Sequence, residues 1–330
     1  MPHPATDRRI DKLISLLVKN ATVVVPGPKI ASHIGVTRLT VWRYIQTLRS
    51  LGVEILGHHG TGYQLRTLPD ILAPSLIQAE LGENEIGHKI IHYFRIDSTN
   101  DAALTLAAEG APHGTVVVAE EQSAGRGRFG REWYSEKSNG NYASVILRPM
   151  LSPADAATLT LRAGLAAHRA VSAATGLAVD IRWPNDLLVN GKKVCGILTE
   201  MSAELDRLHY VVLGVGINVN HSAMPAELKA FATSLSMEGG RHYSRAQILV
   251  NLLRELEKHY RMLLEGGSAP IVRAWANASS YAEGKNVLVR TSGGEFKAVT
   301  AGLDSRGTIR LRREDGREES LVSGEIVEVK

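Results

Sequence analysis

The feature that most constrains the fold of this chain is a change of pattern near residue 67. Before this point, apolar residues follow helical spacing and end in a short hairpin pattern. From Leu68-Pro69-Asp70 onward, short apolar strands alternate with helices. A chain of 330 residues is long enough for several domains. We therefore expect an α+β multidomain fold with domains at residues 1–66, 67–280 and 281–330.

The first 66 residues predict a small helical module. Its first helix is indicated by apolar residues on one face: Ile10, Leu13, Ile14 and Leu17. A short helix over 29–34 would end at Gly35, and Thr37 can cap a longer helix that runs to about Leu51. Residues 53–56 and 63–65 predict a two-stranded hairpin. This order is typical of a winged helix-turn-helix.

Charge supports a nucleic-acid partner for this module. It holds nine basic and three acidic residues, a net charge of +6, whereas the rest of the chain carries −2. On the third helix, Val41, Ile45 and Leu48 would face the core, and Trp42 could belong to the core or stack on a base. The residues expected to face DNA are Arg38, Thr40, Arg43, Tyr44 and Thr47. A module that binds another protein is the alternative interpretation.

Composition excludes several classes of protein. Hydrophobic residues make up 44% of the chain, yet no run approaches the roughly 18 apolar residues of a membrane helix. The first nine residues contain no apolar signal-peptide core. Cys195, the single cysteine, leaves no internal disulfide and no cysteine-rich zinc site, and we expect it to be a buried apolar residue. We expect a cytoplasmic protein without a membrane partner.

A loop of alternating glycine and arginine interrupts the central pattern at residues 125–131. It matches G-x-G-x-x-G, but a strand follows it where a dinucleotide fold needs a helix, and the other protein-kinase motifs are missing. Glycine allows close approach to a ligand, and arginine binds carboxylate and phosphate groups. The loop therefore predicts an anion site, and we expect a ligand to order it.

Two further segments suggest nucleotide chemistry. Trp183-Pro184-Asn185-Asp186 forms a turn between apolar strands, and Lys193 can return alongside Asp186 across the hairpin. A carboxylate beside a cation suits a magnesium–nucleotide site, although an ordinary hairpin turn is the alternative. Residues 214–220 form a glycine-bearing strand, against which a flat ligand could lie.

Taken in order, five blocks resemble the biotin–protein ligase family. They are Asp97-Ser98-Thr99-Asn100 with Gln122, Gly125-Arg126-Gly127-Arg128, Trp183-Pro184-Asn185-Asp186, Lys193-Val194-Cys195-Gly196-Ile197-Leu198 and Gly214-Val215-Gly216-Ile217-Asn218. The N-terminal module resembles that of the bacterial biotin repressor-ligases, and residues 284–330 resemble the family's small SH3-like β-barrel. The resemblance implies a winged helix-turn-helix, a mixed α/β catalytic domain and this barrel. Phe129 departs from it, since many relatives carry a basic residue there.

The resemblance also implies roles for single residues. Biotin would be bound by Ser98, Thr99, Asn100, Gln122, Arg126, Gly127, Arg128, Lys193, Gly214 and Gly216. ATP and the adenylate would be bound by Gly125, Arg126, Arg128, Trp133, Asn185, Asp186 and Asn218. Catalysis would depend on Lys193, Arg128 and Asp186, and Asp186 would also serve magnesium.

The implied reaction joins biotin to ATP as biotinyl-5′-AMP and then transfers biotin to a lysine of a biotin carboxyl carrier protein, as in acetyl-CoA carboxylase. The implied cofactors are ATP and magnesium, and the further partners are operator DNA and a second copy of the chain when the adenylate is bound. Three alternatives stay open. They are a lipoate or octanoate transferase, a repressor without catalysis, and a ligase whose DNA module has lost its operator.

Overall fold

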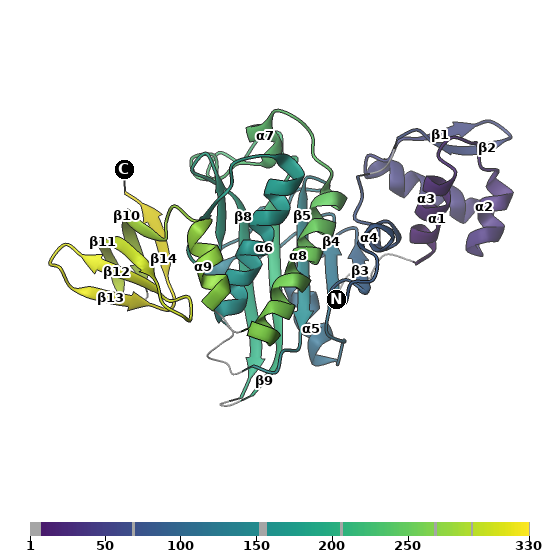
Figure 1. Cartoon of the computed structure of the whole chain (residues 1–330). Coiled ribbons are helices and arrows are strands. Elements are labelled where there is room, and N and C mark those ends of the chain that lie inside the picture. Colours follow the sequence, from purple (N-terminus) through teal and green to yellow (C-terminus); the bar gives the residue numbers. More distant parts are fainter. Residues whose placement is uncertain are drawn as a thin grey trace.

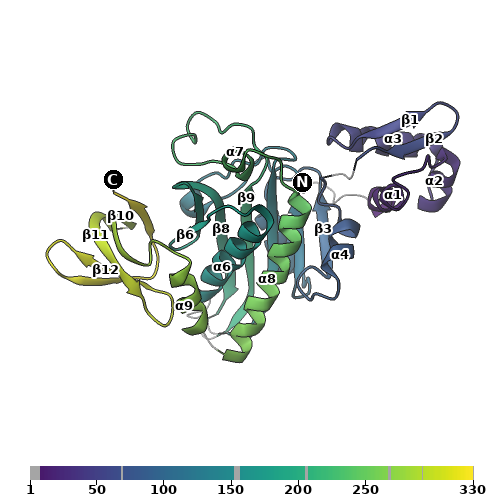
Figure 2. The same ribbon diagram turned by 45° about the horizontal axis from the view of Figure 1, so that its top comes forward.

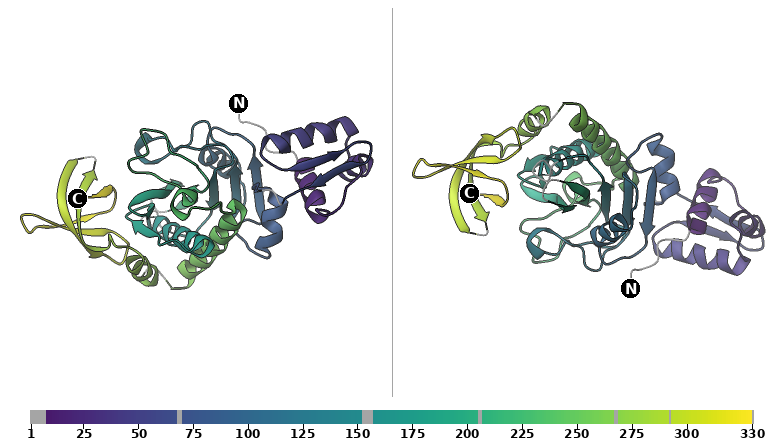
Figure 3. Two further views of the ribbon diagram at one scale, coloured as in Figure 1. Left: turned by 90° about the horizontal axis from the view of Figure 1, so that it is seen from above. Right: turned by 90° about the horizontal axis from the view of Figure 1, so that it is seen from below.

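The computed structural model describes residues 8–67, 70–151, 157–204, 207–266, 269–291 and 293–329. The N-terminal helices and the C-terminal strands lie on opposite sides of a central sheet (Figures 1 and 3). Leu68 and Pro69, where the sequence pattern changes, lie outside the described residues. No helix within these ranges is both long and apolar enough to cross a membrane.

Three helices and a hairpin form the N-terminal module, as predicted. They are α1 (Arg8–Lys19), α2 (Gly27–Ile34), α3 (Arg38–Ser50), β1 (Ile55–His58) and β2 (Gly62–Leu65). Helix α2 begins two residues earlier than predicted because Pro28 fits the first turn, where a backbone N–H has no partner within the helix. Gly35 ends α2 in the left-handed region, at φ 69°. Thr37 caps α3 by accepting a hydrogen bond from Thr40 N at 3.2 Å.

The central sheet has seven strands in the order β3-β4-β5-β9-β8-β7-β6. Their bounds are β3 (Lys89–Tyr93), β4 (Thr115–Ala119), β5 (Gly140–Leu147), β6 (Asp180–Arg182), β7 (Asp186–Val189), β8 (Lys192–Ala203) and β9 (Leu208–Asn218). Strands β3 and β4 are parallel and are joined by α5 (Thr99–Ala108); the other neighbours are antiparallel. The strands predicted over 90–96 and 115–122 each end three residues early, after which only Ile96 and Gln122 pair.

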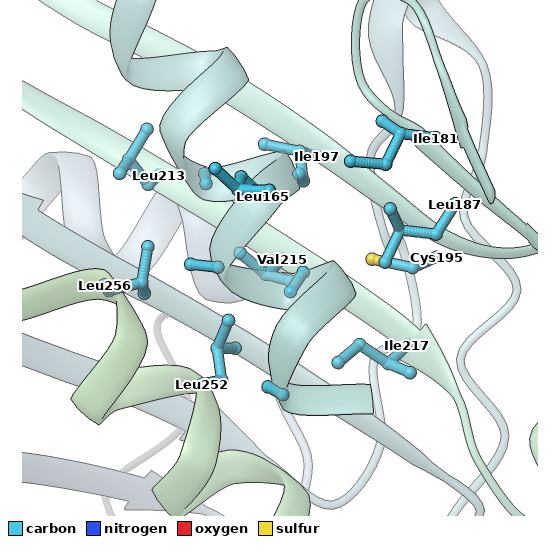
Figure 4. Packing of buried hydrophobic residues seen from close by; sticks show 14 of the residues in the cluster. Leu165, Ile181, Leu187, Cys195, Ile197, Leu213, Val215, Ile217, Leu252 and Leu256 are labelled. Atoms are coloured by element: carbon cyan, nitrogen blue, oxygen red, sulfur yellow. The ribbon is translucent and has the colours of Figure 1, made fainter. Parts of the chain in front are cut away.

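Helices cover both faces of this sheet. The long helices α6 (Ala157–Thr175) and α8 (Arg245–Gly266) lie side by side over one face (Figure 2), and α5 packs on the other. Because neighbouring strand residues point to opposite faces, Leu213, Val215 and Ile217 of β9 join the core beneath α6 and α8 (Figure 4). Gly214 and Gly216 face the other side. Residues 153–156 of the predicted helix over 153–175 lie outside the described residues.

Three shorter helices complete the central part of the chain. They are α4 (Pro74–Leu81), α7 (Leu235–Gly239) and α9 (Ala269–Asn277). Helix α4 follows the N-terminal module. In its first turn, the backbone N of Ser75 donates a hydrogen bond to Asp11 Oδ1 of α1 at 3.0 Å. This bond ties the module to the start of the central part.

Five strands form the C-terminal sheet, as predicted. They are β10 (Glu283–Thr291), β11 (Gly294–Leu303), β12 (Ile309–Arg313), β13 (Glu318–Leu321) and β14 (Glu325–Glu328), in the order β13-β12-β11-β10-β14. Ser292, in the first predicted turn, lies outside the described residues. Among the described residues no ladder joins the edge strands β13 and β14, so a closed barrel is not confirmed.

Candidate functional site

A cavity of about 700 Å³ lies at the N-terminal end of α5, on the face of the sheet opposite α6 and α8. It brings together segments that are up to 227 residues apart, from Ser98 to Glu325. All the residues predicted to bind biotin or ATP line it: Ser98, Thr99, Asn100, Gln122, Gly125, Arg126, Gly127, Arg128, Trp133, Asn185, Asp186, Lys193, Gly214, Gly216 and Asn218. The separate sequence blocks therefore form one site.

A buried polar cluster occupies one end of the cavity. Ser98 caps α5, and Thr99 donates to Gln122 Oε1 through its backbone N (2.8 Å) and its hydroxyl (3.0 Å). Ser144 Oγ lies within hydrogen-bonding distance of Thr99 Oγ1 (2.9 Å) and Asn100 Oδ1 (2.6 Å) and shares its one proton between them. These bonds fix the side chains at the helix start, so the donors and acceptors are held in place before a ligand binds.

Glycines on β9 allow close packing over the sheet. A Cβ atom on Gly214 would lie 2.1 Å from Asn100 Oδ1, and one on Gly216 would lie 2.5 Å from the Trp133 ring. The Trp133 ring therefore packs against the backbone of Gly216, and Lys193 Nζ lies 5.3 Å from its ring centroid. Two buried atoms of residues that line the cavity, Trp133 Nε1 and Asn218 Oδ1, have no hydrogen-bond partner among the described residues.

Carboxylates elsewhere in the chain neutralise two arginines of the glycine-arginine loop. Arg126 is bonded to Asp101 and, at 2.7 Å, to Glu200 Oε1. Arg131 forms two bonds to Glu325 of β14, at 2.9 and 2.6 Å. These carboxylates therefore relieve the repulsion between neighbouring arginine charges within the protein. The prediction that a ligand orders the loop stays a prediction.

Arg128 differs from its neighbours in the loop. It donates to three neutral groups: Gly324 O at 3.0 Å, Asn185 Oδ1 at 3.3 Å and Ser323 Oγ at 3.3 Å. Across the described residues, no carboxylate lies within ion-pair distance of its guanidinium group. Burial lowers the pKa of Arg128. Arg128 lines the cavity and has no direct counter-ion, so its positive charge is available to an anion.

Lys193 and Asp186 meet across the β7–β8 hairpin, as predicted. Lys193 Nζ lies 2.6 Å from Asp186 Oδ1, and Arg182 Nη2 lies 2.7 Å from Asp186 Oδ2. Burial would raise the pKa of Asp186, but the two cations outweigh it and lower the pKa below its ordinary value. Asp186 is therefore ionised and holds the Lys193 side chain at the cavity.

A metal ion on Asp186 would share its carboxylate with Lys193 and Arg182. Both of its carboxylate oxygens are engaged with cations, and the described residues contain no cluster of three or more His, Cys, Asp or Glu that could hold a metal. Cys195, nearby on β8, is fully buried in the core, as predicted, and burial raises the pKa of its thiol. Cys195 is not among the residues that line the cavity.

Sequence reasoning missed several residues of the site. Glu200 and Ser144 support the polar cluster, and Glu325 reaches the loop from the C-terminal sheet. A further segment lies beside Lys193, whose backbone N donates to Phe231 O at 2.8 Å. Its members that line the cavity are Pro225, Glu227, Leu228, Phe231 and Ala232. None of these stands in a recognisable motif, so only the fold brings them to the site.

On α3, the residues predicted to face DNA divide into two groups. Arg38 and Arg43 are exposed, whereas Thr40, Tyr44 and Thr47 are half-buried. The two threonines bond within the helix region: Thr40 to Thr37, and Thr47 to Arg43 O at 3.2 Å. Trp42 is not a core residue, because half of it is exposed (50%). The outer surface of α3 is therefore both basic and apolar.

Comparison with known proteins identifies both parts of this architecture. Residues 93–218 match the "Biotin/lipoate A/B protein ligase family", and residues 9–64 match an "HTH domain". The solved biotin protein ligase from Aquifex aeolicus, in complex with biotin and ATP, is similar to the chain with a TM-score of 0.63 at 28% identity. That similarity covers 72% of this chain and 97% of the Aquifex chain.

Similarity to curated proteins extends over nearly the whole chain. The bifunctional ligase/repressor BirA of Bacillus spizizenii is 41% identical over 92% of this chain and 94% of its own. The biotin–[acetyl-CoA-carboxylase] ligase of Paracoccus denitrificans is 36% identical over 68% of this chain and 94% of its own. Since both the catalytic and the helix-turn-helix parts are matched, the chain belongs to the biotin–protein ligase family, in its bifunctional ligase/repressor form.

Proposed function

We propose that the chain joins biotin to ATP to form biotinyl-5′-AMP, transfers biotin to a lysine of a carrier protein, and represses biotin genes when the adenylate is bound. The observation that carries the proposal is the convergence of all the predicted ligand residues on one cavity. We also propose domain boundaries at residues 1–66, 67–280 and 281–330, with an SH3-like fold for the last.

For biotin, the polar cluster at the start of α5 offers fixed hydrogen-bonding groups. Ser98, Thr99 and Gln122 would bind the ureido ring, and Asn100 would support the turn. Gly214 admits the Asn100 side chain, and Gly216 would leave room along the sheet for the ligand when the Trp133 ring, which packs on it here, moves aside. Arg126, Gly127 and Arg128 would close over the biotin carboxylate and the phosphate. Because hydrogen bonds within the protein already orient the cluster, binding should require little rearrangement there.

Adenylation must bring two anions together. A carboxylate oxygen of biotin attacks the α-phosphorus of ATP, a new C–O–P bond forms, and the bond to the β-phosphate oxygen breaks to release pyrophosphate. Lys193 and Arg128 would stabilise the charge that gathers at the α-phosphate, since preorganised cations act most strongly in a site that excludes water. Asp186 would position Lys193, Trp133 and Asn218 would bind adenine, and Gly125 and Asn185 would support the nucleotide.

Transfer completes the reaction. The neutral amine of the carrier lysine attacks the carbonyl carbon of the adenylate, an amide forms, and AMP leaves. No covalent bond to the enzyme is needed. Magnesium is proposed as a partner of the triphosphate, and Asp186 would serve it while it stays paired with Lys193 and Arg182.

The test is biotin-dependent pyrophosphate release from ATP, followed by biotin transfer to a biotin carboxyl carrier protein. The proposal predicts both, with no turnover when lipoate or octanoate replaces biotin. Turnover with lipoate alone would assign the chain to a lipoate transferase. Biotin binding without pyrophosphate release would leave a repressor without catalysis.

A further inference from the structure

Two large apolar side chains lie on the outer surface of α3. Leu39 is 59% exposed and Trp42 is 50% exposed, and their spacing of three residues places them on the same face of the helix. The opposite face carries Val41, Ile45 and Leu48, which are buried in the core of the module. The module therefore does not need Leu39 or Trp42 for its core.

The surroundings of these side chains select the partner. Arg38 and Arg43 flank them and are exposed, and α3 contains no acidic residue. The module as a whole has a net charge of +6. A second copy of the same surface would bring like charges together, whereas DNA phosphates complement them. The N-terminal part of the second helix in a helix-turn-helix is also the part that reaches base edges.

We propose that Leu39 and Trp42 contact thymine methyl groups in the major groove, so that each operator half-site carries thymine opposite them. The C5-methyl of thymine is the apolar group that the four base pairs present in that groove. Contact with it would remove apolar surface of both partners from water. This inference rests on the proposed DNA-binding function and specifies which feature of the bases the helix reads.

The experiment uses the full chain with biotin and ATP. Duplexes are selected from a randomised library by the unaltered protein, and each thymine of the recovered site is then replaced by deoxyuridine. This change removes one methyl group and keeps the base pair. We expect at least one position in each half-site where the replacement weakens binding about fourfold, the effect of one buried methyl group.

Trp42→Ala should bind the thymine-containing site more weakly than the unaltered protein does. At one such position it should also bind the thymine and deoxyuridine duplexes with equal affinity. Leu39→Ala is the second variant, and Leu56→Ala, in the exposed part of β1, is its matched control, which should keep the difference. Biotin-dependent pyrophosphate release should be unchanged in all three, which checks that the catalytic part is intact.

Three results would overturn the inference. One is an unaltered protein that is insensitive to deoxyuridine at every position. Another is that Trp42→Ala and Leu39→Ala both remain as sensitive to deoxyuridine as the unaltered protein. The third is a loss of self-association by Trp42→Ala without DNA, which would make the surface a contact between copies. If no duplex is recovered at all, the DNA-binding function itself fails, and the two failures are thereby distinguished.

Discussion

Lys193 Nζ lies 2.6 Å from Asp186 Oδ1, and Arg182 holds the other oxygen of the same carboxylate at 2.7 Å. The lysine is therefore held at the cavity by a buried anion that is itself fixed from two sides. Such a lysine is preorganised for the negative charge that develops when biotin attacks ATP.

Replacing Lys193 by alanine should slow adenylation and leave the fold intact. Loss of one preorganised donor costs about 2–4 kcal/mol in the transition state. Arg182 remains beside Asp186 and keeps its charge paired. Lys192→Ala, the neighbouring position on β8, is the control and should adenylate normally. Single-turnover pyrophosphate release measures the rate, and a normal rate in Lys193→Ala would contradict the proposed role.

Arg128→Gly should weaken retention of biotinyl-AMP. The guanidinium of Arg128 is bonded to neutral groups only, so we expect it to bind the adenylate phosphate and shield the anhydride from water. Released adenylate would label lysines of bystander proteins. Arg317→Gly, at a side chain that is 83% exposed, is the control. Labelling that stays confined to the carrier protein in Arg128→Gly would show that the arginine does not retain the adenylate.

The sequence predicted the parts of the site that depend on local geometry. A hairpin brings Asp186 and Lys193 together, and Thr37 and Ser98 cap helices because their side chains bond to the next turn. It could not predict Glu325, which reaches the arginine loop through the packing of separate segments. On α3 the sequence placed Val41, Ile45 and Leu48 in the core correctly but left Trp42 open between the core and the surface, and the structure shows that half of Trp42 is exposed.

A buried ion pair ties the linker after the DNA-binding module to the central sheet. Glu120 is fully buried and lies 2.8 Å from Arg245 Nη1, 3.0 Å from His92 Nε2 and 2.8 Å from the backbone N of Leu72. Burial raises the pKa of Glu120, but Arg245 and His92 outweigh it and bring the pKa to about 2. The ionised form is therefore favoured by folding.

Acid should weaken the stabilisation that ionised Glu120 gives to the folded protein, over a defined range of pH. The ordinary carboxyl pKa is 4.5, so the stabilisation is complete above that pH and is lost as the pH falls toward 2. Glu120→Gln should lower the free energy of unfolding at pH 7 by about 3–5 kcal/mol, because a buried pair is broken, and should lack this acid-dependent part. Urea unfolding at several pH values measures both effects. Glu54→Gln, at a side chain that is 55% exposed, is the control and should unfold like the unaltered protein at each pH. If Glu120→Gln also unfolds like the unaltered protein, the prediction is wrong.

Arg43→Ala should weaken DNA binding and leave ligation unchanged. Arg43 is exposed on the outer surface of α3, far along the chain from the residues that line the cavity. Loss of an arginine contact to a base costs about 1–3 kcal/mol of DNA-binding free energy, and loss of a contact to a phosphate makes DNA affinity depend less on salt concentration. Lys12→Ala, on α1, is the control and should have a smaller effect. Unaltered DNA affinity in Arg43→Ala would remove this face of α3 from the interface.

The adenylate should also promote pairing of two chains. One helix-turn-helix covers a single half-site, so stable binding needs two modules about 34–36 Å apart on one face of DNA. We propose that the central domains pair when biotinyl-AMP is bound. Sedimentation with biotin plus ATP should show a dimer, and without them a lighter species. A chain that stays monomeric with the adenylate bound would contradict ligand-controlled pairing.

The most direct test of the central claim, that one ligand serves both the enzyme and the regulator, is the affinity for DNA with and without biotin plus ATP. The measurement is an equilibrium titration of duplexes from upstream of biotin-synthesis or transport genes. A coupling free energy of about 1–3 kcal/mol predicts binding that is roughly 5- to 150-fold tighter when the adenylate is present. DNA affinity that does not change with the adenylate would leave a ligase and contradict the regulator.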